Sequence, residues 1–323
     1  MRQGEWPKTV VVVTHPHLGD VVNTTPVGGW LRRSWPWARL VALTSPAGRD
    51  LLEATGDFDE VLLRPESPVD QISTLFLLRS LRPSVAVFTY SQRTLVRLAA
   101  WAGIKERWVV QGDRPSPLAT LDVAPLGPEP EVPDSLARLL QAAGIETPSL
   151  APVVRPPAEL ATEAAAFAAR IDPHGLGIVA MHTGSSHPAK RWPRRHWAEL
   201  AKLVQATSHP IVWIGGPEES EHVAGLGAVD TCGKWPVLGT AAFLAQCQCL
   251  VTGDSGPMHL AAGVGCRVVG LFGPTESARF KPYGEGHVLF QGECLGECSG
   301  LEGCRGECMD GLQPAAVLRA VLG

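Results

Sequence analysis

Long hydrophobic runs are absent from this sequence of 323 residues. Uninterrupted apolar runs such as Val10 to Val13 fall far short of the roughly 20 residues that a membrane-spanning helix needs. The N-terminus leads from polar and charged residues into this valine run and then to His15-Pro16-His17, so it lacks the apolar core of a secretory signal. We therefore expect a cytoplasmic protein without a membrane span.

Charge and cysteine are also scarce. Charged residues make up 19% of the chain, and 28 Lys and Arg stand against 32 Asp and Glu, for a formal net charge of -4. This balance excludes a dedicated nucleic-acid binder, which would carry a basic excess. Eight cysteines are too dilute for a disulfide scaffold. With 45% hydrophobic residues the chain can bury a core, and its length suggests two domains.

What the sequence does contain is a regular alternation of two patterns. Short apolar runs typical of strands occur at 9–14, 40–44, 60–63, 85–89, 177–182, 210–214, 249–252 and 267–272. Apolar residues at helical spacing lie between or beside them, at 22–33, 47–55, 69–81, 92–102, 159–170, 194–207, 218–226, 238–246 and 256–264. This alternation predicts an α/β fold with parallel sheets covered by helices on both faces.

A proline-rich stretch from Pro115 to Pro157 interrupts the alternation, with one short helical pattern at 134–143. Because proline fixes φ and lacks an N–H, we interpret this stretch as a connection between domains. The expected domains are 1–155 and 156–323. Ligands of open α/β sheets bind at the carboxyl ends of the strands, so the expected site is a cleft between the two domains.

Two loops of the C-terminal half have the chemistry of a phosphate site. Thr252-Gly253-Asp254-Ser255-Gly256-Pro257-Met258-His259 follows a strand and opens a helix, with Ser255 at the expected N-cap, so the helix N-terminus could hold a diphosphate. His182-Thr183-Gly184-Ser185-Ser186 leads to adjacent Lys190 and Arg191. Hydroxyls, backbone N–H groups and Lys190 suit a pyrophosphate. The alternatives are an ordinary capped helix and a solvated basic turn.

In the N-terminal half, Leu18-Gly19-Asp20 follows the first strand. An acidic side chain at this place could act as a general base on a hydroxyl, and the alternative is a helix cap. Six basic residues and only Glu106 fall between Arg79 and Arg107, so Arg93 and Arg97 are candidates to bind an anionic acceptor. A solvated helix face explains these arginines nearly as well.

A cysteine cluster lies near the C-terminus, at Cys294, Cys298, Cys304 and Cys308. Four thiols at this spacing suit a structural zinc ion, and equally structural thiols that are reduced or form disulfides. The spacing differs from the paired C-x2-C of common zinc ribbons. We expect no role in catalysis.

Five motifs, in order along nearly the whole chain, resemble glycosyltransferase family nine, the ADP-heptose:lipopolysaccharide heptosyltransferases. They are Leu18-Gly19-Asp20, Lys190-Arg191-Trp192-Pro193, Gly215-Gly216-Pro217-Glu218-Glu219, the segment from Gly253 to Ala262, and Leu271-Phe272-Gly273-Pro274-Thr275. The resemblance implies GT-B architecture, with two Rossmann-like domains that face each other across a cleft. It implies inverting, metal-independent transfer of a sugar, heptose from ADP-heptose, to a lipopolysaccharide-type or other anionic acceptor, and contact with the inner membrane.

Site roles follow from the same resemblance. Asp20 matches the general base, whereas the donor-binding positions are Ser185, Ser186, Lys190, Trp235, Asp254, Ser255, Gly256 and His259. One departure concerns the residues before Leu18, where many members carry Arg with Ser or Thr and this chain has His15, Pro16 and His17. A nucleotide-sugar epimerase or hydrolase, and a non-catalytic nucleotide-sugar-binding protein, are the alternative functions.

Overall fold

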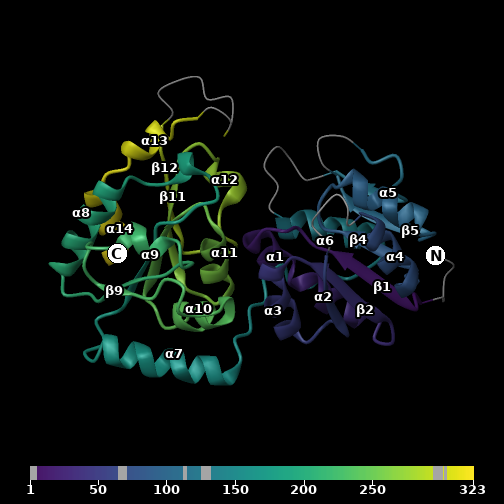
Figure 1. The fold of residues 1–323 in the computed structure, drawn as a ribbon, viewed down its shortest axis with the longest axis horizontal. Helices are drawn as coiled ribbons and strands as arrows, with labels where there is room; N and C mark the ends of the chain where they lie inside the picture. The colour runs from purple at the N-terminus through teal and green to yellow at the C-terminus, as the bar shows by residue number, and fades with distance from the viewer. Residues whose placement is uncertain (1–5, 65–70, 112–114, 125–131, 294–300, 302–303) are drawn as a thin grey trace. The chain divides into compact units, whose positions relative to one another are not determined.

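The computed structural model describes residues 6–64, 71–111, 115–124, 132–293, 301 and 304–323. The chain divides into two compact units, unit 1 from Met1 to Val153 and unit 2 from Val154 to Gly323. Each contains one six-stranded parallel sheet with helices on its faces (Figure 1). The division lies two residues before the 155/156 boundary that the sequence suggests.

The sheet of unit 1 has the strand order β3-β2-β1-β4-β5-β6. Its strands are β1 (Thr9–Val13), β2 (Arg39–Thr44), β3 (Glu60–Leu63), β4 (Val85–Phe88), β5 (Glu106–Val110) and β6 (Leu121–Val123). Every neighbouring pair is parallel. This is the order of the dinucleotide-binding Rossmann fold, in which the direction of strand addition reverses between the first and fourth strands.

The central valines explain how helices cover both faces of this sheet. Val10 and Val12 pack against α2 (Pro26–Ser34) and α6 (Val132–Ala142), whereas Val11 and Val13 pack against α4 (Gln71–Leu81) and α5 (Arg93–Trp101). Successive side chains of a strand point to opposite faces, so a continuous valine run supplies both cores. Two further helices, α1 (Leu18–Thr24) and α3 (Pro46–Thr55), follow β1 and β2.

Unit 2 repeats the same topology. Its strands are β7 (Val179–His182), β8 (Ile211–Trp213), β9 (Val229–Asp230), β10 (Cys249–Gly253), β11 (Arg267–Phe272) and β12 (Val288–Gln291), in the order β12-β11-β10-β7-β8-β9. Numbered within the unit, this is again 3-2-1-4-5-6, and the direction of strand addition reverses between β7 and β10.

Two helices, α8 (Arg194–Gln205) and α14 (Pro314–Leu322), pack on one face of the unit 2 sheet, and α11 (Gly256–Gly263) lies on the other side of its strands (Figure 1). The remaining helices are α7 (Ala158–Ile171), which contacts α10 (Val237–Leu244), and the short α9 (Glu219–Val223), α12 (Ser277–Phe280) and α13 (Glu307–Asp310). Among the residues described, no helix has both the length and the apolar character to span a membrane.

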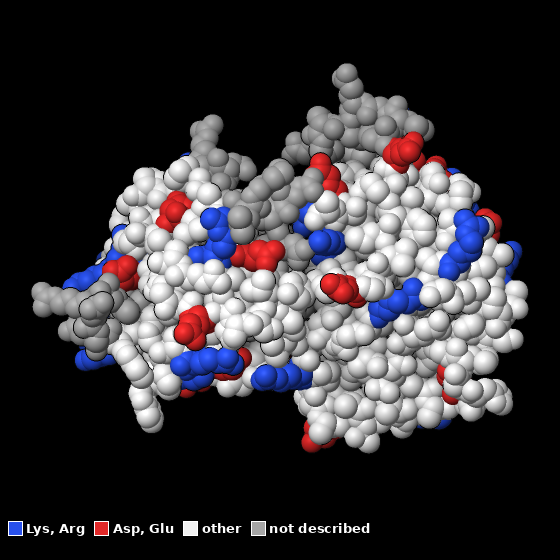
Figure 2. All heavy atoms as spheres, turned by 180° about the vertical axis from the view of Figure 1, so that it is seen from behind, with Lys and Arg blue, Asp and Glu red and all other residues white. Residues whose placement is uncertain are grey.

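The charged side chains of the face shown in Figure 2 are of both signs and interspersed. This distribution agrees with the balanced composition, and the face lacks the stripe of positive charge that a nucleic-acid binder presents.

Three expectations about the fold are wrong. The helix expected at 22–33 is two helices, because Pro26 opens α2 after Thr25. The proline-rich stretch is largely part of unit 1 and not an interdomain connection: β6 extends the sheet at its edge, and Leu136, Leu139 and Leu140 of α6 are fully buried. Strands β5, β6, β9 and β12 are missing from the sequence-based assignment.

Candidate functional site

In each unit, polar side chains gather where the direction of strand addition reverses. Helices on the two faces diverge there, so the carboxyl ends of the first and fourth strands border a crevice in open α/β sheets. In unit 2 these strands are β7 and β10, which pair in register with His182 opposite Thr252. In unit 1 they are β1 and β4, with Val13 opposite Phe88.

A buried hydrogen-bonded cluster joins the ends of β7 and β10. His182 Nδ1 lies 3.0 Å from Thr252 Oγ1 and 3.3 Å from Ser255 Oγ, and the two hydroxyls are 2.9 Å apart. Burial lowers the pKa of His182 to about 4, so its imidazole is neutral at pH 7. Ser255 occupies the N-cap of α11, as expected, but its side chain makes no cap hydrogen bond because it turns to this cluster instead.

An ion pair brings the two predicted donor loops together. Lys190 ends a short 3-10 turn (Pro188–Lys190), and its Nζ lies 3.0 Å from Asp254 Oδ2, in the loop after β10. Each side chain is only 11% exposed. A charge with so little water around it needs a partner, and Asp254 supplies one while leaving further N–H donors on the ammonium group.

Tight glycines hold the loop after β7 against the helix α9. A Cβ on Gly184 would lie 2.2 Å from Glu219 Oε1 and 2.9 Å from His182 Nε2. The Gly216 N–H donates to the Glu219 carboxylate, and burial together with the neighbouring Glu218 raises the pKa of Glu219. Only glycine fits at position 184, so the backbone of this loop approaches the cluster closely.

The other predicted donor residues lie around this centre. Ser185 is half-buried and its hydroxyl accepts from the His187 N–H, whereas Ser186 is exposed. Gly256 and His259 lie in the first turns of α11 and are half-buried. Trp235 packs edge-on against Phe167, with ring centroids 5.0 Å apart.

Trp235 also contacts Phe243 of α10, at 4.8 Å, so its described ring contacts belong to the packing between α7 and α10. Stacking on a nucleotide base stays a prediction for this residue.

In unit 1, Asp20 lies in the first turn of α1, directly after the end of β1. Its Oδ2 is 2.9 Å from His15 Nδ1, and the side chains of Asp20 and His15 are 36% and 27% exposed. The N-cap position belongs to His17, so the alternative of Asp20 as the helix cap is wrong. The carboxylate is therefore held by an imidazole and still open to solvent.

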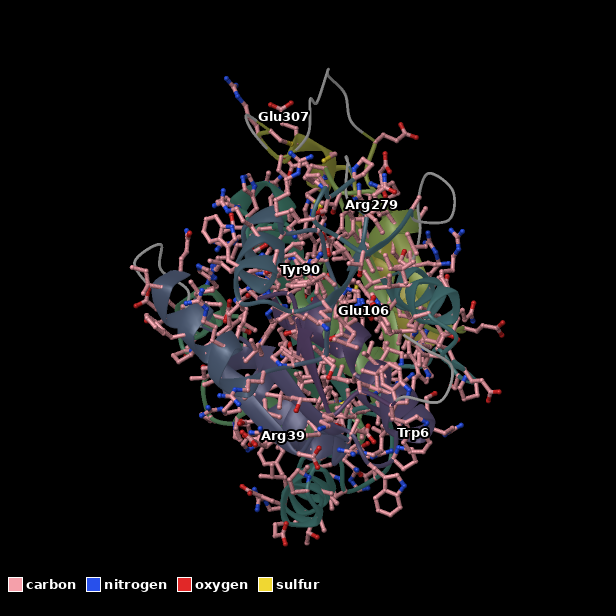
Figure 3. The ribbon with its side chains drawn as sticks, turned by 90° about the vertical axis from the view of Figure 1, so that its right-hand side faces the viewer. Trp6, Arg39, Tyr90, Glu106, Arg279 and Glu307 are labelled. Carbon is pink, nitrogen blue, oxygen red and sulfur yellow. The ribbon has the colours of Figure 1, made fainter. Side chains whose placement is uncertain are left out.

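Tyr90 extends this arrangement to the end of β4 (Figure 3). Its ring lies edge-on to His15, with centroids 4.7 Å apart, and its hydroxyl accepts a hydrogen bond from Arg64, which follows β3. Burial raises the pKa of Tyr90 despite the nearby guanidinium. The carboxyl ends of β1, β3 and β4 thus contribute Asp20, His15, Arg64 and Tyr90 to one cluster.

Arg93 begins α5 and Arg97 follows one turn later, both exposed. The Arg97 guanidinium lies 5.2 Å from the ring centroid of Trp101. A role in acceptor binding stays a prediction for both arginines.

Half of the cysteine cluster lies outside the described residues, namely Cys294 and Cys298. Cys308 is buried in the core of unit 2, and a Cβ on Gly273 would lie 3.1 Å from its sulfur. Cys304 is half-buried and its sulfur accepts from the Gly306 N–H. No group of three or more His, Cys, Asp or Glu suited to a metal occurs among the described residues, so the zinc hypothesis stays a prediction.

Sequence reasoning missed several polar residues of both clusters: His182, Thr252, Glu219, Tyr90 and Arg64. A usable signal existed for some of them, because His182, Thr252 and Tyr90 end or directly follow the strands nearest each reversal in strand order. Arg64 had no such signal, since it depends on how β3 is placed in the sheet.

Two Rossmann-like sheets, each with a polar cluster at its carboxyl edge, define a protein of the GT-B class. The family profile described as "Glycosyltransferase family 9 (heptosyltransferase)" matches residues 121–298, more than half of the chain. The chain belongs to glycosyltransferase family 9.

Comparison with individual proteins gives a consistent picture. Lipopolysaccharide heptosyltransferase 2 of Escherichia coli K12 is 36% identical over 107 residues, a match that covers 29% of this chain and 30% of that relative. The crystal structure of a glycosyl transferase family 9 protein from Veillonella parvula has a TM-score of 0.80 at 21% identity, covering 98% of this chain and 96% of that one. E. coli ADP-heptose lps heptosyltransferase II has a TM-score of 0.75 at 19% identity, with 97% of both chains covered. These structural likenesses concern the fold.

Proposed function

We propose that this protein is an inverting glycosyltransferase that transfers heptose from ADP-heptose to a lipopolysaccharide-type or other anionic cell-surface glycan. The observation that carries the proposal is the contact between Lys190 and Asp254, because it unites two separate family motifs at the crevice edge of unit 2. A buried cation beside a hydroxyl-rich loop and a helix N-terminus suits a nucleoside diphosphate.

The donor site belongs to unit 2 in this proposal. Lys190 keeps its contact with Asp254 and directs its other N–H groups to the diphosphate, while the first turn of α11 and the loop at Ser185 and Ser186 supply further donors. The hydrogen bonds from Ser255 to His182 and Thr252 hold the entry to α11 in one conformation. Fixed donors stabilise the departing nucleoside diphosphate without reorganisation in the transition state.

The base belongs to unit 1. The Asp20 carboxylate accepts the proton of the acceptor hydroxyl while that oxygen bonds to the anomeric carbon, and the bond from this carbon to the diphosphate breaks on the opposite side. His15 is a positioning residue, because its contact with Asp20 fixes the carboxylate on the loop between β1 and α1. Inversion follows from this single displacement.

A catalytic metal is not needed in this scheme, because Lys190 and the helix N-terminus provide the positive charge that a divalent ion would supply. The chain does contain an Asp-x-Asp pattern, at Asp57 and Asp59. The Asp59 carboxylate accepts hydrogen bonds from Arg32 and from the Leu40 N–H before β3 begins, which places it at the amino edge of the sheet, opposite Asp20. The cytoplasmic location inferred from the sequence stays a prediction.

The test is a transfer assay with ADP-heptose, other nucleotide-sugars and deacylated lipopolysaccharide-core acceptors, in which NMR reads the product anomer. The proposal predicts acceptor-dependent product with inverted configuration. Retained configuration would refute the mechanism. Donor turnover without an acceptor would instead identify an epimerase or hydrolase, and no turnover by wild type or Asp20→Ala would leave a binding protein.

A further inference from the structure

The helix α4 of unit 1 exposes large apolar side chains that a helix on a sheet normally buries. Ile72 is 65% and Phe76 is 62% exposed, and because they are four residues apart they lie on the same side of the helix. Leu78 and Leu81 of the same helix are buried against the sheet. The helix is thus apolar toward the core and also toward solvent.

The neighbouring helix α5 exposes a row of Arg93, Arg97 and Trp101, also spaced by four residues. Trp101 is 58% exposed, with the Arg97 guanidinium over its ring. Arg79 of α4 donates from Nη2 to the Trp101 carbonyl at 3.2 Å, and the two helices contact each other. Their outward sides therefore form one surface, the α4–α5 face, made up of Ile72, Phe76, Arg79, Arg93, Arg97 and Trp101.

The charge around this surface has one sign. From residue 71 to residue 110 the sequence has six Lys and Arg and a single acid, Glu106. Glu106, labelled in Figure 3, accepts hydrogen bonds from Trp108 Nε1 and Thr120 Oγ1 in its own strand region. Arg107 donates to backbone carbonyls, so the exposed cations are Arg79, Arg82, Arg93, Arg97 and Lys105.

We propose that the α4–α5 face binds the surface of an anionic lipid bilayer. Ile72, Phe76 and Trp101 would enter the boundary between headgroups and acyl chains, and the arginines would contact lipid phosphates. Apolar side chains flanked by Arg and Lys on a helical surface are the pattern of interfacial binding, in which apolar burial and attraction to anionic lipid add. Isolated exposed residues such as Trp37 need no such explanation.

The test is co-sedimentation of the full chain with vesicles of 30% phosphatidylglycerol and 70% phosphatidylcholine, against pure phosphatidylcholine. We expect binding to the anionic vesicles alone, weakened by 0.5 M salt because exposed charges are screened. The double variant Ile72→Ser with Phe76→Ser should partition about 10- to 100-fold more weakly. Arg93→Gln and Arg97→Gln should each cost about 5-fold.

Trp37→Ser is the matched control, because Trp37 is 86% exposed on the same unit but outside the α4–α5 face. It should bind vesicles as wild type does. Failure of wild type to bind anionic vesicles, or equal losses in Trp37→Ser and the double variant, would overturn the proposal. A change of oligomeric state in the double variant with unchanged vesicle binding would also overturn it, in favour of a protein interface. The assay contains no glycosyl donor, so its outcome is independent of the proposed function.

Discussion

The two units share one topology, yet the clusters at their carboxyl edges differ in chemistry and in exposure. In unit 2, Lys190 and Asp254 are 11% exposed and His182 is buried, with a glycine loop packed closely around them. In unit 1, Asp20 and His15 are 36% and 27% exposed. The same fold can thus present a desolvated cation, which suits an anion, and an open carboxylate, which suits proton transfer. Position comes from the topology, and chemistry comes from the loop residues.

The largest expected effect tests the unit 1 side of this comparison. Asp20→Asn keeps the shape but cannot accept a proton, so kcat should fall about 10²- to 10⁴-fold while affinity for the nucleoside diphosphate barely changes. Steady-state kinetics and ADP calorimetry measure the two quantities. Asp50→Asn, an exposed carboxylate on α3, is the control and should behave as wild type. Loss of nucleotide binding in Asp20→Asn would make Asp20 a donor ligand or a structural residue.

The next effect tests unit 2. Lys190→Ala removes the cation next to the proposed diphosphate, and loss of a charge-assisted hydrogen bond should weaken donor affinity about 10- to 150-fold. Lys202→Ala removes the same charge from an exposed position on α8 and should leave affinity unchanged. Thermal unfolding must accompany the titration, because Asp254 loses its buried partner. Equal ADP affinities in a folded Lys190→Ala protein would remove this residue from the site.

His182 links the burial of unit 2 to pH. The pKa of His182 is about 4 in the folded protein and about 6.5 when unfolded, so below pH 6.5 the unfolded chain binds a proton that the folded protein does not. Stability therefore falls as pH falls toward 4, by about 2 kcal/mol between pH 7 and pH 5. Urea unfolding of wild type and His182→Asn at both pH values measures this difference. Identical pH dependence in the two proteins would show that His182 is not held neutral.

The smallest expected effect concerns His15. His15→Ala removes the hydrogen bond to Asp20, worth a net factor of about 2 to 10, and should lower kcat by that factor without changing donor affinity. His15→Asn retains a side-chain N–H and should restore most of the rate. A rate that falls equally in both variants would mean that the imidazole does more than position Asp20.

Strong periodic segments made the fold predictable, and short or locally encoded segments did not. The valine run of β1 and the apolar β11 are clear in the sequence, because buried parallel strands are apolar on both sides. In contrast, β6 has three residues and lies at the edge of its sheet, so it gives no periodic signal.

For the site, motif residues such as Lys190 and Asp254 were predictable as members of two loops, but their contact was not. Contacts of this kind depend on strand order, which places residues 64 positions apart along the chain side by side. The same holds for Arg64 and Tyr90, whose hydrogen bond joins the ends of β3 and β4.

Hydrogen exchange with and without ADP tests most directly whether the two units divide the work. Backbone amides slow their exchange where a ligand stabilises the local structure. The account predicts that ADP slows exchange in peptides from residues 182–191 and 253–260 of unit 2, and leaves residues 13–24 of unit 1 unchanged. Protection confined to residues 13–24, with none at 182–191 or 253–260, would contradict it.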